Sequence, residues 1–269
     1  MKSWAQKLFP ALSDSEAMDK LWDLVLKIVR VDAENPFRAW ETHVAELGNR
    51  TQLMNEYQCT ALHYSGPGTD LKVILPEDHQ WISLATVKNA NHIPFFPNLP
   101  SEELFTAPHR TGVNGTLRST MPLYYGGTMI ENIQFTFADG GIVDYSADVG
   151  METLKGIIDS DEGARYLGEV ALVPVTSPIA KLGTVFLNPL YDENASCHFA
   201  IGNAYPARIV NGPQMSPEER LERGLNHSMT HVDFMVGSSD LNIDGETKDG
   251  RRIPILRAGN WVLGEDEAK

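Results

Sequence analysis

The sequence predicts an α+β protein in which a helical opening precedes a mixed, strand-rich body. Residues 13–29 and 36–47 carry apolar side chains at helical spacing, and the first run begins with the capping-box pair Ser13 and Glu16. From about Ala61 onward, short runs of strand-forming residues alternate with turn residues. We therefore expect helices first and short strands afterwards.

The later elements follow from the same signals. The stretch 93–100, IPFFPNLP, is too rich in proline for a helix or a central strand, so we expect a rigid extended segment there. The other expected elements are strands at 61–65, 70–75, 81–85, 129–138, 142–147, 168–174, 183–187, 229–236 and 252–256, turns at 114–115 and 139–141, and helices at 150–158 and 216–223, with a further helical turn up to residue 166.

Composition limits the kinds of partner. The chain has 269 residues and a formal charge of −14, which argues against nucleic acid and anionic membranes as main partners. It contains neither a run of about 18 apolar residues nor an apolar N-terminal signal, so we expect no membrane partner and a cytoplasmic location. Cys59 and Cys197 lie far apart and do not suggest a disulfide scaffold.

The sharpest local motif is THVDFMV, residues 230–236. Alternation along a strand places His231 and Asp233 on one face and Val232 and Phe234 on the other. An imidazole and a carboxylate on the same face can bind one metal ion, although a solvent-facing polar pair gives the same pattern. The motif alone leaves both readings open.

A second group of candidates lies in DENASCH, residues 192–198, before a segment that we expect to be helical. His198 is either a ligand or a buried, hydrogen-bonded histidine. Tyr205 follows after seven residues, about two helical turns, and would share its helix face. An ordinary core tyrosine would give the same spacing.

Two glutamates complete the candidates. Glu169 enters the apolar run GEVALVP, where a carboxylate is costly unless it is paired, ligated or at the solvent-facing strand mouth. Glu103 follows the proline-rich stretch in an acidic doublet, which in loops is usually solvated.

Two histidines and three carboxylates would suit Zn, Co or Mn better than a thiolate-rich structural zinc site. A carboxylate can also bridge two cations. The sequence contains no HExxH, GxSxG, P-loop or GxGxxG motif.

Several long motifs occur in fixed order: EELFTAPHRTGVNGTLRST, DEGARYLGEVALVP, DENASCHFAIGNAYP, HVDFMVGS and a closing pattern from Ile243 to Trp261. With these motifs, and with its opening helices and ALHYSGPGTDLKV, the chain resembles the aminopeptidase T / aminopeptidase S (PepS) family of metallopeptidases over essentially its whole length.

The resemblance implies a two-metal aminopeptidase that acts on peptides with a free N-terminus. It implies that one divalent ion is held by Glu103, Glu169 and His198, with Glu169 shared. The same resemblance assigns His231 and Asp233 to the second ion.

Tyr205 matches a family tyrosine at the metal centre, where it is a weak ligand or a donor to the oxyanion. For the general base the candidates are Glu103 and His109.

The resemblance also implies a domain organisation. Family members carry a further α/β domain ahead of the matched region and pair as homodimers. We therefore expect residues 1–60 to be a helical segment that is the tail of, or connection to, such a domain, and residues 61–269 to be the metal-binding catalytic domain.

Three alternatives remain at this stage. One is a metal-binding fragment that is inactive because the N-terminal domain is absent. Another is a glycosidase that uses two carboxylates and no metal. The last is a structural or interaction module that binds no metal.

Overall fold

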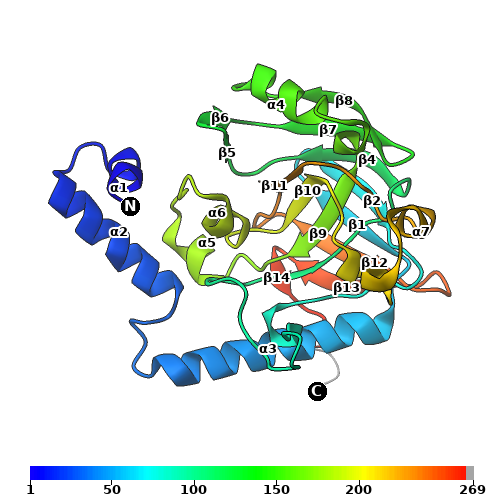
Figure 1. The fold of residues 1–269 in the computed structure, drawn as a ribbon, viewed down its shortest axis with the longest axis horizontal. Helices are drawn as coiled ribbons and strands as arrows, with labels where there is room; N and C mark the ends of the chain where they lie inside the picture. Colours follow the sequence, from blue (N-terminus) through cyan, green and yellow to red (C-terminus); the bar gives the residue numbers. More distant parts are fainter. Residues whose placement is uncertain (265–269) are drawn as a thin grey trace.

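The computed structural model describes residues 1–264 and confirms the expected mixture of opening helices and later strands (Figure 1). The helices at the start of the chain are α1 (Lys2–Leu8), α2 (Asp14–Ile28) and α3 (Pro36–Tyr57). Ser13 caps α2 as expected, with both reciprocal hydrogen bonds of a capping box to Glu16. No described helix is both long and apolar enough to cross a membrane.

The strands form two main antiparallel sheets and one hairpin. The large sheet has the order β14-β13-β12-β1-β2-β4-β7-β8, and the smaller has the order β11-β10-β9-β3. The strands of the large sheet are β1 (Ala61–Gly66), β2 (Thr69–Ile74), β4 (Val113–Arg118), β7 (Gln134–Ala138), β8 (Gly141–Ser146), β12 (Asn242–Glu246), β13 (Arg252–Arg257) and β14 (Asn260–Trp261). Those of the smaller sheet are β3 (Leu104–Thr106), β9 (Leu167–Leu172), β10 (His198–Gly202) and β11 (His231–Met235), and the hairpin is β5 (Leu123–Tyr125) with β6 (Thr128–Ile130).

The two main sheets pack against each other through one aromatic core. The rings of Tyr64 on β1 and Phe199 on β10 lie 5.1 Å apart, as do those of Phe135 on β7 and Phe234 on β11. All four side chains are almost fully buried. Because side chains alternate along a strand, the opposite face of the small sheet is left for other residues.

Short helices surround this body (Figure 1). They are α4 (Met151–Ile158), α5 (Pro178–Leu182), α6 (Pro189–Glu193) and α7 (Pro217–Glu222), with 3-10 turns at η1 (Leu84–Thr86), η2 (Glu162–Arg165), η3 (Pro206–Arg208) and η4 (Gly212–Gln214). Helix α2 reaches the body through Ile28, which packs with Ile179 and Phe186.

Several of the secondary-structure predictions were wrong. Asn114 and Gly115 lie inside β4 rather than in a turn, because Gly115 has a φ of +122° and lets the strand approach Asp70 where a Cβ would lie 2.1 Å from its carbonyl oxygen. The segment 81–85 forms a short bridge at Ile82 followed by η1. The segment 183–187 is not a strand and joins α5 to α6, where the Asp192 carboxylate accepts from the Phe186 backbone N–H at 2.6 Å.

The largest local error concerns the segment after His198. It is strand β10 and not a helix, so the seven-residue spacing to Tyr205 does not place the two side chains on one helix face. The division into segments 1–60 and 61–269 stays a prediction, although the opening helices end at Tyr57 and the strands begin at Ala61.

Gly168 on β9 offers a test of how tightly this region is packed. A Cβ there would lie 2.3 Å from the backbone oxygens of Gly202 and Asn203, so Gly168→Ala must push β9 and β10 apart. We expect a loss of about 2–5 kcal/mol in the free energy of unfolding, measured by urea denaturation. The control Gly156→Ala in α4, where a Cβ meets nothing within 4 Å, should instead stabilise by roughly 0.5–1 kcal/mol. Equal effects of the two substitutions would contradict this account.

Candidate metal centre

Strand register gathers the predicted residues on one face of the small sheet. Glu169 on β9 and Asp233 on β11 both lie opposite Ala200 of the central strand β10. His198 and His231 are each two residues from this row on their own strands, so they project on the same side. The four side chains therefore share one face because of the period-two alternation.

Small side chains leave room at the centre of this face. Ala200 lies between Glu169 and Asp233 in the register, and Ala171 lies between His198 and Phe105. An alanine projects only one carbon from the sheet. The polar groups around these two alanines can therefore converge above the sheet without filling the space between them.

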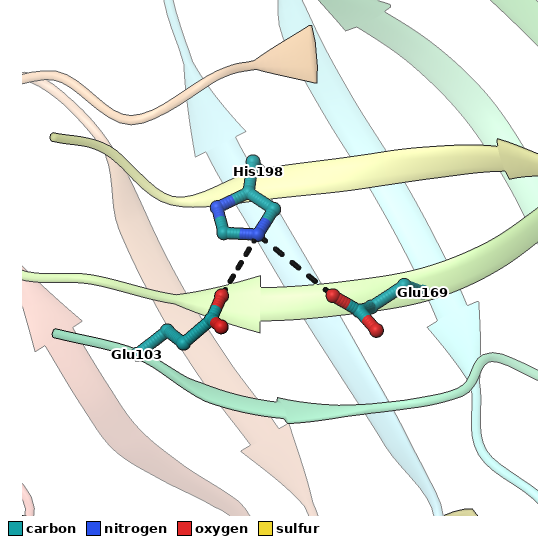
Figure 2. Close-up of side chains that lie close together, drawn as sticks. All are labelled: Glu103, Glu169 and His198. Carbon is teal, nitrogen blue, oxygen red and sulfur yellow. Dashed lines mark ion pairs between the residues drawn. The ribbon is translucent and has the colours of Figure 1, made fainter. Parts of the chain in front are cut away.

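One trio of side chains is formed by Glu103, Glu169 and His198 (Figure 2). The Nε2 atom of His198 lies 3.0 Å from Oε2 of Glu103 and 3.9 Å from Oε1 of Glu169. All three residues are at least nine-tenths buried. Glu103 reaches the trio from the segment just before β3, while the other two come from β9 and β10.

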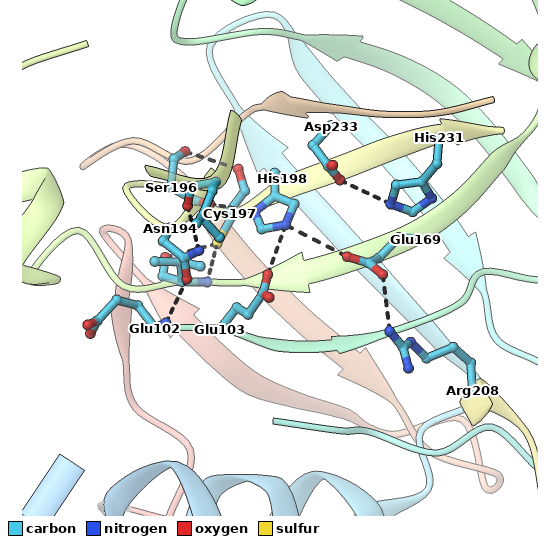
Figure 3. A network of polar contacts seen from close by, with 12 residues as sticks. Glu102, Glu103, Glu169, Asn194, Ser196, Cys197, His198, Arg208, His231 and Asp233 are labelled. Atoms are coloured by element: carbon cyan, nitrogen blue, oxygen red, sulfur yellow. Dashed lines mark hydrogen bonds and ion pairs between the residues drawn. The ribbon is translucent and has the colours of Figure 1, made fainter. Parts of the chain in front are cut away.

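A second trio is formed by Glu169, His231 and Asp233, with one ligand atom of each residue within 4.8 Å of the others. The Nε2 atom of His231 lies 3.6 Å from Oδ1 of Asp233. Glu169 thus belongs to both trios. Figure 3 shows one of its carboxylate oxygens toward His198 and the other toward Arg208. Because it belongs to both trios, Glu169 is the residue that could be shared between two cations.

The histidines are oriented so that their Nε2 lone pairs face the carboxylates. The Nδ1 of His198 lies 3.0 Å from the Ser196 carbonyl oxygen, and the Nδ1 of His231 lies 2.8 Å from the Asn203 carbonyl oxygen. Nδ1 must be the donor in each case, which leaves Nε2 as an acceptor in the neutral ring. A backbone carbonyl in this role is typical of metal-binding histidines.

Two buried carboxylate oxygens also indicate a metal site. Oε2 of Glu103 and Oδ1 of Asp233 are buried without a hydrogen-bond partner among the described residues. Unpaired buried carboxylate oxygens are costly, and here they face imidazole nitrogens. A divalent cation in each trio would satisfy both kinds of group, so the donor set fits metal ions.

The electrostatics of the cluster also show its excess of negative charge. Burial, with the nearby carboxylates of Glu103 and Asp233, raises the pKa of Glu169 to about 7. Burial lowers the pKa of His231, but the hydrogen bond and charge of Asp233, together with Glu169 and the Asn203 carbonyl, raise it to about 9. Without cations, these side chains would therefore hold protons at the positions where cations would bind.

Glu193 is a member of this neighbourhood that the sequence analysis took only as part of a helix cap. It ends the one-turn helix α6, and its pKa is raised to about 9 by burial and by the carboxylates of Asp233 and Glu103. The apolar setting of α6 cannot be read from the sequence. The available signal was an acidic residue five positions before His198 in the same motif.

Tyr205 lies at the rim of the cluster, although not for the helical reason expected. It follows β10 and precedes η3, and its ring centroid lies 4.9 Å from that of His231. The side chain is 45% exposed. Burial, together with the carboxylates of Glu169 and Asp233, raises its pKa, so the phenol keeps its proton and can donate it in a hydrogen bond.

Arg208 on η3 is a second residue that the sequence analysis missed. Its guanidinium lies 3.5 Å from Oε2 of Glu169 and 3.9 Å above the ring of Phe105 (Figure 3). The residue is only 8% exposed, and its backbone is held because its carbonyl accepts from the Gln80 N–H at 2.7 Å. Arg208 thus supplies a fixed positive charge beside the shared carboxylate.

His109 and Cys197 belong to neither trio. The ring of His109 packs against Gly224, and its Nδ1 lies 3.2 Å from the Thr111 hydroxyl. The role of His109 as a general base stays a prediction. The Cys197 thiol faces the other side of β10 and lies 3.2 Å from the Val173 carbonyl oxygen, and burial raises its pKa to about 12.

Arg208 provides a test of the charge balance in the metal-free protein. Arg208→Met leaves the buried Glu169 carboxylate among other carboxylates, so we expect a loss of about 3–5 kcal/mol in unfolding free energy in the presence of a chelator. The control Arg251→Met removes an exposed partner of Asp249 and should cost less than about 1 kcal/mol. A small effect of Arg208→Met would contradict the role assigned to this charge.

Comparison with known proteins agrees with the resemblance found in the motifs. The sequence profile of the thermophilic metalloprotease (M29) family matches residues 1–261. The chain is 50% identical over 261 residues to aminopeptidase 2 of Geobacillus stearothermophilus and 50% identical over 260 residues to aminopeptidase AmpS of Bacillus subtilis strain 168. Both alignments cover 97% of this chain and 63% of the relative, so the chain spans less than two thirds of their length.

Comparison of the fold with solved structures indicates the same family. The structure of wild-type AmpT from Thermus thermophilus superimposes with a TM-score of 0.90 at 42% identity, covering 98% of this chain and 63% of that chain. The agreement of profile, relatives and fold confirms the expected resemblance. The chain belongs to the thermophilic metalloprotease (M29) family.

Proposed function

We propose that this chain is the catalytic portion of a two-metal aminopeptidase that removes residues from the N-terminus of peptides. The observation that carries the proposal is the membership of Glu169 in both trios. The named activities of the relatives, aminopeptidase 2 and aminopeptidase AmpS, supply the substrate class. The comparisons give no support to the alternative of an inactive metal-binding fragment.

In the proposed centre, one cation is held by Glu103, Glu169 and His198. The second cation is held by Glu169, His231 and Asp233. Two divalent cations in such a centre supply Lewis-acid chemistry, activating water and polarising the scissile carbonyl. Mixed nitrogen and oxygen ligands without a thiolate favour Zn, Co or Mn.

The chain's own groups would carry the proton and charge movements. Tyr205 donates a hydrogen bond from its phenol to the oxygen of the carbonyl under attack, because its raised pKa keeps it protonated. The carboxylate available to accept a proton from water is Glu103. Glu193, with its pKa raised to about 9, is protonated near neutral pH in the absence of cations. Arg208 holds the shared Glu169 carboxylate in place through its second oxygen. The homodimer and the cytoplasmic location implied by the resemblance remain predictions.

The proposal is tested by following hydrolysis of an aminoacyl chromogenic amide after loading the protein with Co, Zn or Mn. We expect turnover of the substrate with a free amine and none of its N-acetylated counterpart, since an aminopeptidase recognises the free N-terminus. Equal hydrolysis of both substrates would point to an endopeptidase or amidase that does not recognise the free amine. Turnover that resists exhaustive chelation would contradict the metal centre.

Glu169→Gln should reduce turnover by more than the roughly 10–100-fold typical of residues that only support a metal ligand. The amide keeps the shape of the side chain but loses the charge that would be shared between the two cations. A matched control is Glu218→Gln on the exposed face of α7, which should leave turnover unchanged. Bound metal is counted by elemental analysis of both variants, and full metal content with full activity in Glu169→Gln would refute the scheme.

Metal affinity should depend on pH in a defined direction. Below its pKa of about 9, His231 in the metal-free chain carries a proton that must leave when a cation binds. The apparent dissociation constant should therefore rise as pH falls from 9 to 7, by about tenfold per pH unit for each proton released. Chelator-competition titrations at three pH values measure this dissociation constant. A constant metal affinity between pH 7 and 9 would contradict the assignment of His231 as a ligand.

A further inference from the structure

A buried ion pair connects the opening helices to the segment that carries Glu103. The guanidinium of Arg30, just after α2, donates to both carboxylate oxygens of Glu102, at 2.6 and 2.8 Å. The Glu102 carboxylate is almost fully buried, with a side-chain exposure of 4%. His43 on α3 approaches the same segment, its Nε2 lying 2.8 Å from the Ser101 carbonyl oxygen. Two helices thus hold the residues immediately before Glu103.

The arginine itself is fixed in direction. Arg30 has a φ of +60°, and its backbone N–H donates to the Lys27 carbonyl at 3.0 Å, so it ends helix α2 in a left-handed conformation. Its guanidinium lies 4.9 Å from the centre of the Trp40 ring, and the Trp40 indole N–H donates to the Val29 carbonyl at 2.9 Å. The two-pronged donor is therefore already oriented when it meets the carboxylate.

The backbone of Glu102 is held as firmly as its side chain. Its N–H donates to the side-chain oxygen of Asn194 at 2.7 Å, and the Asn194 amide donates to the Leu190 carbonyl at 2.9 Å. Asn194 directly follows Glu193 at the end of α6. One hydrogen bond therefore joins the segment of Glu103 to the helix of Glu193.

The carboxylates of the two adjacent glutamates point in different directions. Glu103 faces His198 at the centre, whereas the Glu102 carboxylate lies on the far side of Asn194, away from the cluster (Figure 3). Fixing Glu102 at its backbone and at its carboxylate leaves Glu103 little freedom to turn. Protein stability alone does not require the Arg30–Glu102 ion pair, since a buried ion pair can often be replaced by apolar residues of similar volume without loss of stability.

We propose that Arg30 and Glu102 are positioning residues that hold Glu103 in the geometry for binding its metal ion. The opening helices thereby set the affinity of one of the two cation positions. This inference rests on the proposed function, because it takes Glu103 as a metal ligand.

The test uses the double variant Arg30→Met/Glu102→Gln, which removes both charges and so avoids an uncompensated buried charge. Affinity for Co is measured by chelator competition, and thermal unfolding is followed on the metal-free protein. We expect a melting temperature close to that of the wild type, and affinity for one of two Co ions reduced by about 10–100-fold. The matched control is Arg257→Met/Asp244→Asn, which removes an arginine–carboxylate pair of the large sheet and should leave both affinities unchanged.

A milder variant covers the case in which the double variant does not fold. Arg30→Lys keeps the charge but loses the two-pronged contact, and should give an affinity between those of the wild type and the double variant. Wild-type affinity for both ions in a folded variant, with only the melting temperature changed, would overturn the positioning role. Failure of the wild-type chain to bind any metal would instead overturn the proposed function, and the positioning role with it.

Discussion

The rest of the site depends on one constraint, the concentration of buried carboxylates around Glu169. This residue belongs to both trios and has Arg208 beside its second oxygen. Its pKa is raised by burial and by neighbouring carboxylates, so the cluster is unfavourable unless positive charge enters it. Metal ions, protons and Arg208 are alternative sources of that charge. In the metal-free chain the histidines take up protons, which links metal binding to pH.

The fold meets this constraint by using the two faces of one small sheet differently. One face buries Phe199 and Phe234 against the large sheet, and this packing fixes the strand register. The other face then carries Glu169, His198 and Asp233 at positions that the register dictates. Residues from outside the sheet complete the cluster from loops and short turns. The core and the site are therefore two consequences of the same alternation.

Local sequence patterns were sufficient to predict the relative positions of site residues that lie on the same strand. The HVD motif predicted that His231 and Asp233 share a face, and the structure has them on β11 as expected. The prediction that His198 and Tyr205 share a helix face was wrong, because an apolar run such as FAIG is compatible with a buried strand as well as with a helix. Arg208 and Glu193 were missed because they reach the cluster from a 3-10 turn and a one-turn helix, whose positions depend on tertiary packing. The motif resemblance identified the ligand candidates that spacing alone left open.

The most direct measurement is an anomalous-difference map from crystals of the chain soaked with Co or Zn. The account predicts two peaks, one enclosed by Glu103, Glu169 and His198 and the other by Glu169, His231 and Asp233, with Glu169 contacting both. A single peak would contradict the shared carboxylate as the basis of a two-metal centre. Two peaks elsewhere, or none at this face of the sheet, would contradict the assignment of the site itself.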